Sequence, residues 1–420
     1  MKKITNELLK EEYYEIDHKS GLKILVMEKP DYSGAFAMFG TRYGSVDTCF
    51  RLMGEESYTS VPEGIAHFLE HKLFESEELD AFERFAKTGA NANAFTSFDR
   101  TCYIFQCADN FYENLEILLD FVKAPYFTEE TVQKEQGIIG QEIRMYQDDP
   151  DWQVLFNLLR GLYVNNPVRI DIAGTVESIA EINAELLYSC YRTFYNNSNM
   201  CLAVAGNVKV EEVIAIADKV LKIEEPVYFE QIIPEEPYKV ATDYIEEKLG
   251  VESPKFAVGF KESNDEIIPS PKKVILYNLA LEIIAGKFSP LYIRLLDESL
   301  INTSFGKEYF YGRGFASMLF SGESKNPEKV KEEIVKEIKR IKKDGVAQTD
   351  FEICLKKKYG AEIYSYNDVN DLANNLCDAW LNNYDIFDNI ELYKTITKED
   401  VEKIIKDGFD TENVCLSVII

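Results

Sequence analysis

Histidine is scarce in this chain, with only 3 in 420 residues. Cysteine is present, but the 8 cysteines are scattered and no two form a Cys-x-x-Cys pair. That spacing excludes a ribbon-type zinc site and gives no indication of a disulfide framework. We therefore expect free thiols in a reducing compartment.

Long apolar runs and positive charge are lacking as well. No run of about 18 apolar residues occurs, so no membrane-spanning segment is predicted. The first residues are charged rather than apolar, unlike a signal peptide, and we expect a cytoplasmic protein. A formal net charge of -27 excludes nucleic acid as a partner. The same charge can steer basic peptides toward the chain, or it can simply keep the surface solvated.

Length and composition predict a globular protein of more than one domain. Hydrophobic residues make up 46% of the chain, which is enough to fill a core. Three prolines among acidic residues mark a linker at residues 226–243. We expect an N-terminal lobe that carries the functional site at residues 1–225 and a second lobe at residues 244–420.

The order of predicted elements repeats in the two halves, as strands, a helix, more strands and then helices. This favours an α+β fold of two similar lobes, each a mostly antiparallel sheet packed with helices. The predicted strands cover residues 22–28, 34–46, 94–106, 200–205, 256–260, 305–321 and 414–419, and the predicted helices cover residues 110–122, 129–146, 272–285, 328–343 and 350–375, with another beginning near residue 210.

Two of the three histidines, His67 and His71, stand four residues apart, and Glu70 directly precedes the second. In a helix these positions share one face. Two imidazoles can bind a zinc ion there, and the carboxylate can take a proton from metal-bound water. Pro62 and Gly64 favour a helix start just before the motif. The alternative, two surface or core histidines without a metal, is weakened by the scarcity of histidine elsewhere.

A catalytic zinc needs a third protein ligand and one open position for water. Glu135 and Glu142 are seven residues apart on a predicted helix, so both project from the same side. Ile138 and Ile139 between them suggest that one face of this helix is buried, where a glutamate needs a partner. The residues alone leave two interpretations open, a metal ligand or a solvated surface charge.

The motif resembles that of the pitrilysin/insulinase family of zinc peptidases, in which the order is His-x-x-Glu-His. The resemblance is to bacterial members of about this length, similar to the catalytic subunit of the mitochondrial processing peptidase. Further stretches that resemble the family are Tyr43 to Asp47, Gly89 to Thr96 with Asp99, Thr101 and Tyr103, Ile172 to Thr175, Tyr195 to Met200, and Gly206 with Asn207.

The resemblance implies one zinc ion per chain, bound by His67, His71 and Glu142, with Glu70 as the general base. Glu135 matches a second glutamate that supports the ligands and so belongs to the catalytic machinery. Asn93 and Ala94 match an edge strand to which a peptide substrate adds as an extra strand. Pairing is also implied, as a homodimer or with a related chain, around a chamber in which the peptide is cut.

One departure from the family pattern lies in the second half. Active members often carry an Arg and a Tyr there, and Leu296 and Thr303 occupy the matching positions. A partner chain can supply these groups, or nearby side chains can replace them. The candidates for replacement are Arg294, Tyr309, Tyr311 and Arg313.

The expected function is zinc-dependent cleavage of peptides or processing of precursors. The first alternative is an inactive scaffold subunit of a peptidase-like complex, which the missing Arg and Tyr favour. The second is a zinc hydrolase with a non-peptide substrate. Manganese or cobalt would also suit two histidines and a glutamate.

Overall fold

The computed structural model describes residues 1–77, 80–263 and 266–420. The chain divides into two compact units, each made of three segments. This division differs from the expected lobe boundaries. Residues 144–170, expected in the N-terminal lobe, belong to unit 2, and residues 363–387, expected in the second lobe, belong to unit 1. Unit 1 comprises Met1–Ile143, Asp171–Ile232 and Ile363–Phe387, and unit 2 comprises Arg144–Ile170, Ile233–Glu362 and Asp388–Ile420.

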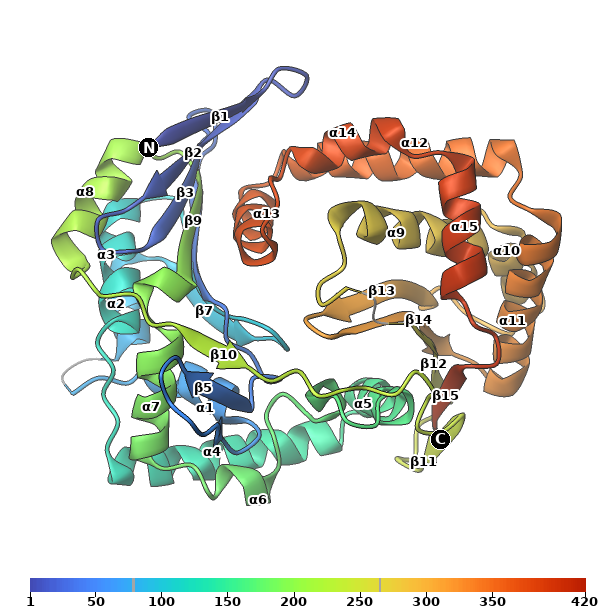
Figure 1. Cartoon of the computed structure of the whole chain (residues 1–420), viewed down its shortest axis with the longest axis horizontal. Coiled ribbons are helices and arrows are strands. Elements are labelled where there is room, and N and C mark those ends of the chain that lie inside the picture. The colour runs from blue at the N-terminus through green and yellow to red at the C-terminus, as the bar shows by residue number, and fades with distance from the viewer. Residues whose placement is uncertain (78–79, 264–265) are drawn as a thin grey trace. The chain divides into compact units, whose positions relative to one another are not determined.

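Unit 1 is built on a seven-stranded sheet (Figure 1). Every neighbouring pair is antiparallel except β3 with β9. A second, three-stranded sheet has β5 (Cys49–Leu52) between β10 (Phe229–Gln231) and β6 (Thr59–Ser60). In spatial order, the strands of the large sheet are β1 (Lys2–Asn6), β2 (Glu11–Asp17), β3 (Lys23–Glu28), β9 (Met200–Gly206), β4 (Ala35–Thr41), β8 (Thr101–Cys107) and β7 (Asn91–Thr96).

Helices α2 and α3 pack against one another and against this sheet, and α8 packs on α3 (Figure 1). Strands β4 and β9 are buried along their whole length, so the core of the unit lies at the middle of the sheet. The helices of unit 1 are α1 (Ile65–Leu73), α2 (Ala81–Thr88), α3 (Phe111–Val122), α4 (Glu129–Gln147, whose last turn enters unit 2), α6 (Val176–Ile179), α7 (Ala184–Phe194), α8 (Val210–Val220) and α13 (Val369–Asn382).

Unit 2 is built on a five-stranded sheet, with a core of apolar side chains between the sheet and its helices. Its strands, in spatial order, are β11 (Tyr244–Glu247), β15 (Val414–Ile419), β12 (Lys255–Lys261), β14 (Phe315–Glu323) and β13 (Gly306–Gly312). Its helices are α5 (Pro150–Leu162), α9 (Pro271–Ala285), α10 (Pro290–Asp297), α11 (Pro327–Asp344), α12 (Gln348–Ser365, whose last residues belong to unit 1), α14 (Asp388–Thr395) and α15 (Lys398–Gly408).

The two units share one strand topology. The order β11-β15-β12-β14-β13 repeats the order β3-β9-β4-β8-β7, and in each case only the first pair is parallel. The predicted α+β class and the predicted repetition of elements are therefore confirmed. The repeat is one of strand order and direction, and it makes individual positions in the two sheets equivalent.

The segments that the two halves exchange occupy equivalent places. Helix α13 packs on β4 and β9 in unit 1, and α5 packs on β12 and β15 in unit 2. A glycine makes room for the helix each time. A Cβ atom on Gly40 would lie 2.9 Å from the Cys377 Sγ, and a Cβ atom on Gly259 would lie 2.8 Å from the Leu162 Cδ1. Close packing of a helix on a sheet needs such small residues.

Two predicted elements are wrong. The run at residues 94–106 is a hairpin, because the chain turns between β7 and β8, where the Ser97 N–H donates to the Arg100 carbonyl oxygen at 2.8 Å. The helix predicted for residues 350–375 is two helices, α12 and α13. Asp368 begins the second by accepting from the backbone N–H groups of Asn370 and Asp371.

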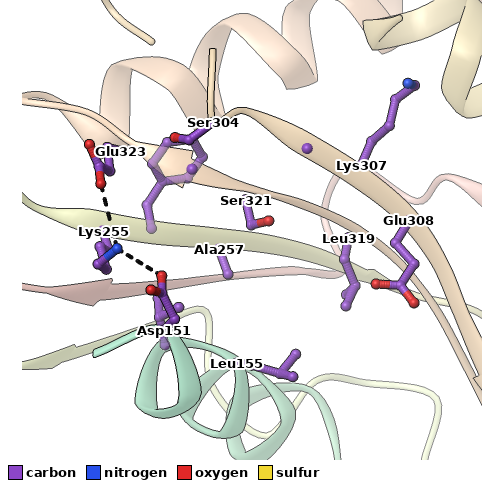
Figure 2. Close-up of a pocket in the computed structure, with 14 residues that line it drawn as sticks. Asp151, Leu155, Lys255, Ala257, Ser304, Lys307, Glu308, Leu319, Ser321 and Glu323 are labelled. Carbon is purple, nitrogen blue, oxygen red and sulfur yellow. Dashed lines mark hydrogen bonds and ion pairs between the residues drawn. The ribbon is translucent and has the colours of Figure 1, made fainter. Parts of the chain in front are cut away.

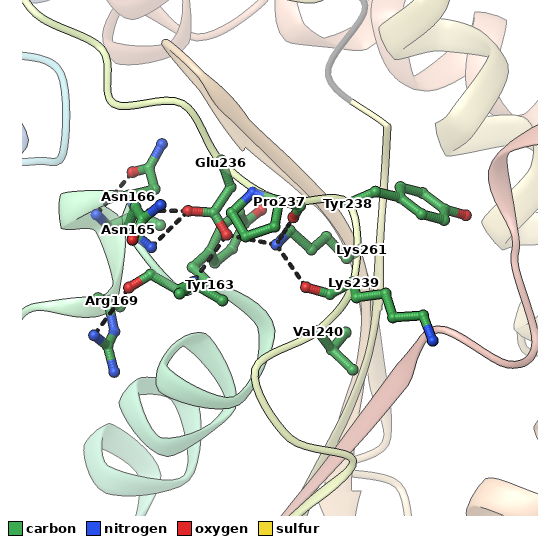
Figure 3. A network of polar contacts seen from close by, with 12 residues as sticks. Tyr163, Asn165, Asn166, Arg169, Glu236, Pro237, Tyr238, Lys239, Val240 and Lys261 are labelled. Atoms are coloured by element: carbon green, nitrogen blue, oxygen red, sulfur yellow. Dashed lines mark hydrogen bonds and ion pairs between the residues drawn. The ribbon is translucent and has the colours of Figure 1, made fainter.

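The predicted linker is not wholly irregular, because β10 within it pairs with β5. Farther along, Glu236 anchors the linker to unit 2 (Figure 3). Its carboxylate accepts from the backbone N–H groups of Val164, Asn165 and Asn166 at 2.7–2.8 Å. The Lys261 Nζ donates to the same carboxylate at 2.6 Å and to the Pro237 carbonyl oxygen at 2.7 Å.

Within the part of the chain that the structure describes, no single helix is long and apolar enough to cross a membrane. Helices α9 and α10, bent by 41° to one another, pass that test only as a pair, by length and composition.

Replacement of Glu236 by Gln should lower the stability of the fold. Burial raises the pKa of Glu236, but Lys261 and the three N–H groups outweigh it and lower that pKa. Burial lowers the pKa of Lys261, so the ammonium depends on this partner. We expect a loss of about 3 kcal/mol at neutral pH. The carboxylate stabilises the fold above the unfolded glutamate pKa and ceases to do so as the pH falls through the lowered folded pKa. The difference in unfolding free energy between the wild type and Glu236→Gln should therefore become smaller at acidic pH.

Urea unfolding at several pH values measures this difference. The matched control is Glu235→Gln at the exposed neighbouring position, which should change stability little. Equal stability of the Glu236 variant and the wild type at neutral pH would contradict the proposed anchor.

Candidate metal centre

Helix α1 begins where two stretches of backbone come close together. Gly64 has a φ of 86°, and a Cβ atom there would lie 2.3 Å from the Ala173 carbonyl oxygen. The Ser178 hydroxyl donates to the Glu63 carbonyl oxygen at 2.9 Å, which holds the two stretches together. The segment at residues 172–175, singled out from the sequence, thus sets the position at which the helix starts.

The three motif residues lie on the same side of α1, as their spacing predicts. His67 and Glu70 are each 8% exposed, and His71 is half-buried. The two imidazole rings are 4.6 Å apart between centroids. Phe68 and Leu69 are fully buried and attach the helix to the core. The histidines and the glutamate are therefore held close together by a helix that is itself buried.

Helix α4 brings the two glutamates to this place. One face of the helix is buried, as predicted; it carries Ile139, whereas Ile138 is 46% exposed. The Glu142 carboxylate lies between the two imidazoles, 3.7 Å from the His67 Nε2 and 3.4 Å from the His71 Nε2. The structure therefore brings together all three predicted ligands, two from α1 and one from α4.

Glu135 lies two turns before Glu142 and contacts His71 rather than the space between the ligands. Its Oε1 is 3.0 Å from the His71 Nδ1. When the ring is neutral, this contact places the proton on Nδ1 and leaves the Nε2 lone pair directed at Glu142. A carboxylate in this position orients a ligand ring and increases its basicity.

The surroundings shift the pKa of each ring differently. Burial, aided by the charge of His71, lowers the pKa of His67 to about 3, so its ring is neutral at physiological pH. Burial also acts to lower the pKa of His71, but the hydrogen bond that the ring donates to Glu135 and the charges of Glu70 and Glu142 outweigh it, and the pKa is raised. The carboxylates therefore give the site a negative potential, which would favour a bound cation.

Glu70 lies beside these groups without joining the cluster of ligand atoms. Its Oε2 accepts a hydrogen bond from the Thr96 hydroxyl at 2.8 Å. Burial raises the pKa of Glu70, although the bond from Thr96 opposes the shift. Thr96 belongs to a stretch that the sequence singled out, but its contact with Glu70 was not predicted. A hydroxyl at the end of a strand gives no signal of such a contact until the fold is known.

The predicted substrate residues Asn93 and Ala94 lie on β7, which forms the edge of the large sheet. The Ala94 backbone N–H donates to the Asn93 side-chain oxygen at 2.9 Å, so the asparagine occupies a donor of this edge. Thr96, the last residue of β7, contacts Glu70, so this strand borders the site. The two predicted residues thus lie on the strand that borders the glutamate.

The candidates for the missing Arg and Tyr have other contacts within unit 2. Arg294 pairs with Glu333 at 3.0 Å, and the buried Tyr309 donates from its hydroxyl to Glu262 at 2.6 Å. Leu296 is 37% exposed at the end of α10. Arg294 and Tyr309 therefore serve unit 2 itself.

The donor set fits a zinc ion. Ligand atoms of His67, His71 and Glu142 all lie within 4.8 Å of one another. Zinc–ligand bonds of about 2.1 Å in a tetrahedron place neighbouring ligand atoms about 3.4 Å apart. The two oxygens of the Glu142 carboxylate lie 3.7 Å from the His67 Nε2 and 3.4 Å from the His71 Nε2, which is close to that spacing. Two imidazoles and one carboxylate form the set found in catalytic zinc sites with an open fourth position.

Comparisons with known proteins agree with this kind of site. A model described as "Insulinase (Peptidase family M16)" matches residues 54–176, and one described as "Peptidase M16 inactive domain" matches residues 181–358. The "Uncharacterized zinc protease YmfH" of Bacillus subtilis is 38% identical over 100% of this chain and 99% of its own length. The chain therefore belongs to the pitrilysin/insulinase family, peptidase family M16.

A solved structure supports the same assignment. The "putative M16-like peptidase from Alicyclobacillus acidocaldarius" has a TM-score of 0.95 and 35% identity, with 99% of this chain and 100% of that chain covered. A "Probable mitochondrial-processing peptidase subunit beta" of Arabidopsis thaliana is 29% identical over 41% of this chain and 34% of its own length. The relatives thus include proteins named as zinc proteases and a processing-peptidase subunit.

Replacement of Gly64 by Ala should destabilise unit 1, because the new Cβ atom would overlap the Ala173 carbonyl oxygen. The matched control is Gly89→Ala, since Gly89 also has a positive φ, of 78°, but no atom lies within 4 Å of its Cβ position. A positive φ costs alanine about 1–2 kcal/mol. We expect the Gly64 variant to lose about 2 kcal/mol more than the control. Urea unfolding with EDTA measures both, and equal losses would contradict the close approach.

Proposed function

We propose that the chain is a zinc-dependent endopeptidase that cleaves peptides or processes precursors. The observation that carries the proposal is the convergence of His67 and His71 from α1 with Glu142 from α4, beside the buried Glu70. His67, His71 and Glu142 would bind the ion, and Glu135 would orient His71. Bound zinc lowers the pKa of a water molecule and polarises a carbonyl group.

Glu70 is the group that moves protons in this proposal. A carboxylate with a raised pKa accepts a proton from the attacking water and returns it to the leaving amine. The Thr96 hydroxyl donates to one carboxylate oxygen, Oε2, and so fixes the orientation of the carboxylate. No serine or cysteine nucleophile is required, and burial raises the pKa of thiols such as Cys190 and Cys415, which disfavours thiolates.

The substrate would be an extended peptide that adds to the edge strand β7 near Asn93 and Ala94. The Asn93 side chain would have to turn away, because its oxygen accepts from the Ala94 N–H that a substrate carbonyl would use. We further propose that the chain acts as a pair, with a second copy or a related chain. Such a partner is one source for the absent Arg and Tyr groups.

The second candidate is a catalytically weak subunit that serves a peptidase-like complex. The observation in its favour is that Leu296 and Thr303 stand where active members often carry Arg and Tyr. The full set of ligands together with Glu70 favours the peptidase, since a scaffold needs none of them.

Replacement of Glu70 by Gln should strongly reduce cleavage and retain zinc. We expect zinc near one per chain in both proteins, and a drop in kcat/KM of about 10²- to 10⁴-fold in the variant. Cleavage of a quenched fluorescent peptide mixture and metal analysis of the same samples measure this. Glu130→Gln, at the exposed start of α4, is the matched control and should keep full activity.

Three results would change the assignment. Zinc bound without cleavage by the wild type would favour the weak subunit, and cleavage restored by a related chain would then identify the partner. Chains that bind no zinc would contradict the metal centre itself. Equal cleavage by the wild type and the Glu70 variant would exclude Glu70 as the base.

Replacement of Glu135 by Gln should weaken zinc binding without removing a ligand. The amide can still accept the bond from the His71 Nδ1, but it lacks the charge that increases the basicity of the ring. We expect zinc affinity to fall about tenfold, the lower end of the range for such supporting carboxylates. Competition with a chromophoric zinc chelator measures it, again beside Glu130→Gln. An unchanged affinity would show that the contact with His71 does not tune the ligand.

A further inference from the structure

A cavity of about 510 Å³ lies in unit 2, on the face of the sheet that α5 partly covers (Figure 2). It lies between α5 and the strands β12, β14 and β13. Leu155 from α5 and Leu319 from β14 line it with apolar surface, as does Ala257 from β12. The cavity belongs to unit 2 alone and contains none of the residues of the metal centre.

The repeated topology explains why the cavity exists. Gly40 pairs with Cys201 in β9, and the equivalent Gly259 pairs with Cys415 in β15, which aligns the registers of the two sheets. In this alignment, Ala257, Ser321 and Gly306 of unit 2 take the positions of larger residues in unit 1. The larger residues are Met38, Ile104 and Asn93, respectively. Small side chains at all three positions leave the space open.

The charges at the cavity are predominantly negative. Lys255 lies between two carboxylates, 2.8 Å from Asp151 and 3.5 Å from Glu323. Lys307 pairs with Glu282 at 3.0 Å, and Figure 2 shows its side chain directed away from the apolar wall. Three carboxylates and one ammonium therefore face the space, counting Glu308 with Asp151 and Glu323.

Glu308 is an exposed residue at the mouth of the cavity, and its carboxylate has no hydrogen-bond or ion-pair partner among the described residues. It lies on β13 directly opposite Leu319, at one end of the apolar wall (Figure 2). The other two carboxylates share Lys255 at the far end. A ligand with an aliphatic stem and a cationic head complements this arrangement, since the stem can pack on Leu155 and Leu319 while the head pairs with Glu308.

We propose that this cavity binds an arginine or lysine side chain of a peptide. The proposal rests on the proposed function only for the peptide nature of the ligand. The positive head group complements the excess of carboxylates at the cavity, among which Glu308 is free of a protein cation in the described part of the chain, and the long side chain complements the apolar wall. Binding of this kind selects peptides by a basic residue in a place that takes no part in bond cleavage.

Two fluorescein-labelled peptides of equal length, identical except for a single Arg or Gln, provide the test. Their affinities are measured by fluorescence anisotropy on the full chain with EDTA present, so that neither zinc nor cleavage is required. We expect the wild type to bind the Arg peptide about fivefold more tightly than the Gln peptide, as for one partly exposed ion pair. The preference should decrease at high salt.

Two variants should abolish the preference by different routes. Glu308→Gln removes the charge at nearly constant shape, and Ser321→Phe fills the space from β14. Glu332→Gln is the matched control, because it removes an equal charge from a side chain that is 69% exposed on α11. It should retain the fivefold preference. Thermal unfolding confirms that each variant is folded, and Glu308→Gln decides the test if Ser321→Phe is not.

Equal affinity of the wild type for the two peptides would overturn the proposal, whether or not the chain cleaves peptides. A preference that persists in Glu308→Gln would also overturn it, since the arginine would then bind elsewhere. Conversely, an Arg preference that requires Glu308 in a chain without peptidase activity would support this cavity and contradict only the proposed catalysis.

Discussion

The contacts between the ionisable side chains of α1 and those of α4 are the interaction on which the site depends, because these side chains are buried or half-buried and each needs a partner. Glu142 lies between two imidazoles, Glu135 is bonded to His71, and Thr96 is bonded to Glu70. The His67 Nδ1 has no hydrogen-bond partner in the described part of the chain. Such a concentration of buried polar groups costs stability unless a cation or a proton neutralises it. A bound metal ion would remove this cost, and the gain in stability would contribute to the affinity for the metal.

Residues of the stretches that the sequence singled out lie around α1 and help to fix its position. The Tyr103 and Tyr195 hydroxyls are 2.9 Å apart in the buried interior, near enough to the charge of Glu70 for it to contribute to raising both their pKa values. The backbone at Ala173 allows only glycine at position 64. Residues far apart in the sequence thus support the position of one short helix.

The repeated sheet shows how one topology carries two kinds of chemistry. In unit 1, larger residues fill the face that α13 covers, and the metal centre borders the end of β7. In unit 2, which contains no histidine, small residues on the equivalent face leave a cavity, and an acidic side chain stands at its edge. The fold therefore sets the frame, and side chains at equivalent positions decide what each sheet can bind.

Local sequence patterns by themselves determined much of the secondary structure and part of the candidate site. The spacing of His67, Glu70 and His71 places them on one face of a helix, since helical periodicity acts within a few residues. The seven-residue spacing does the same for Glu135 and Glu142. Alternation did not reveal the hairpin at Ser97, because apolar residues continue on both sides of the turn. Likewise, helical periodicity continued from α12 into α13 past the cap at Asp368.

The tertiary structure alone decided which carboxylate meets the histidines, because two separate helices must first pack. It also decided which sheet each exchanged helix covers. Gly40 and Gly259 provide equivalent room on β4 and β12, so the glycine by itself does not decide which helix each sheet receives. That choice depends on long-range packing of complete surfaces, which the sequence encodes only through the fold as a whole.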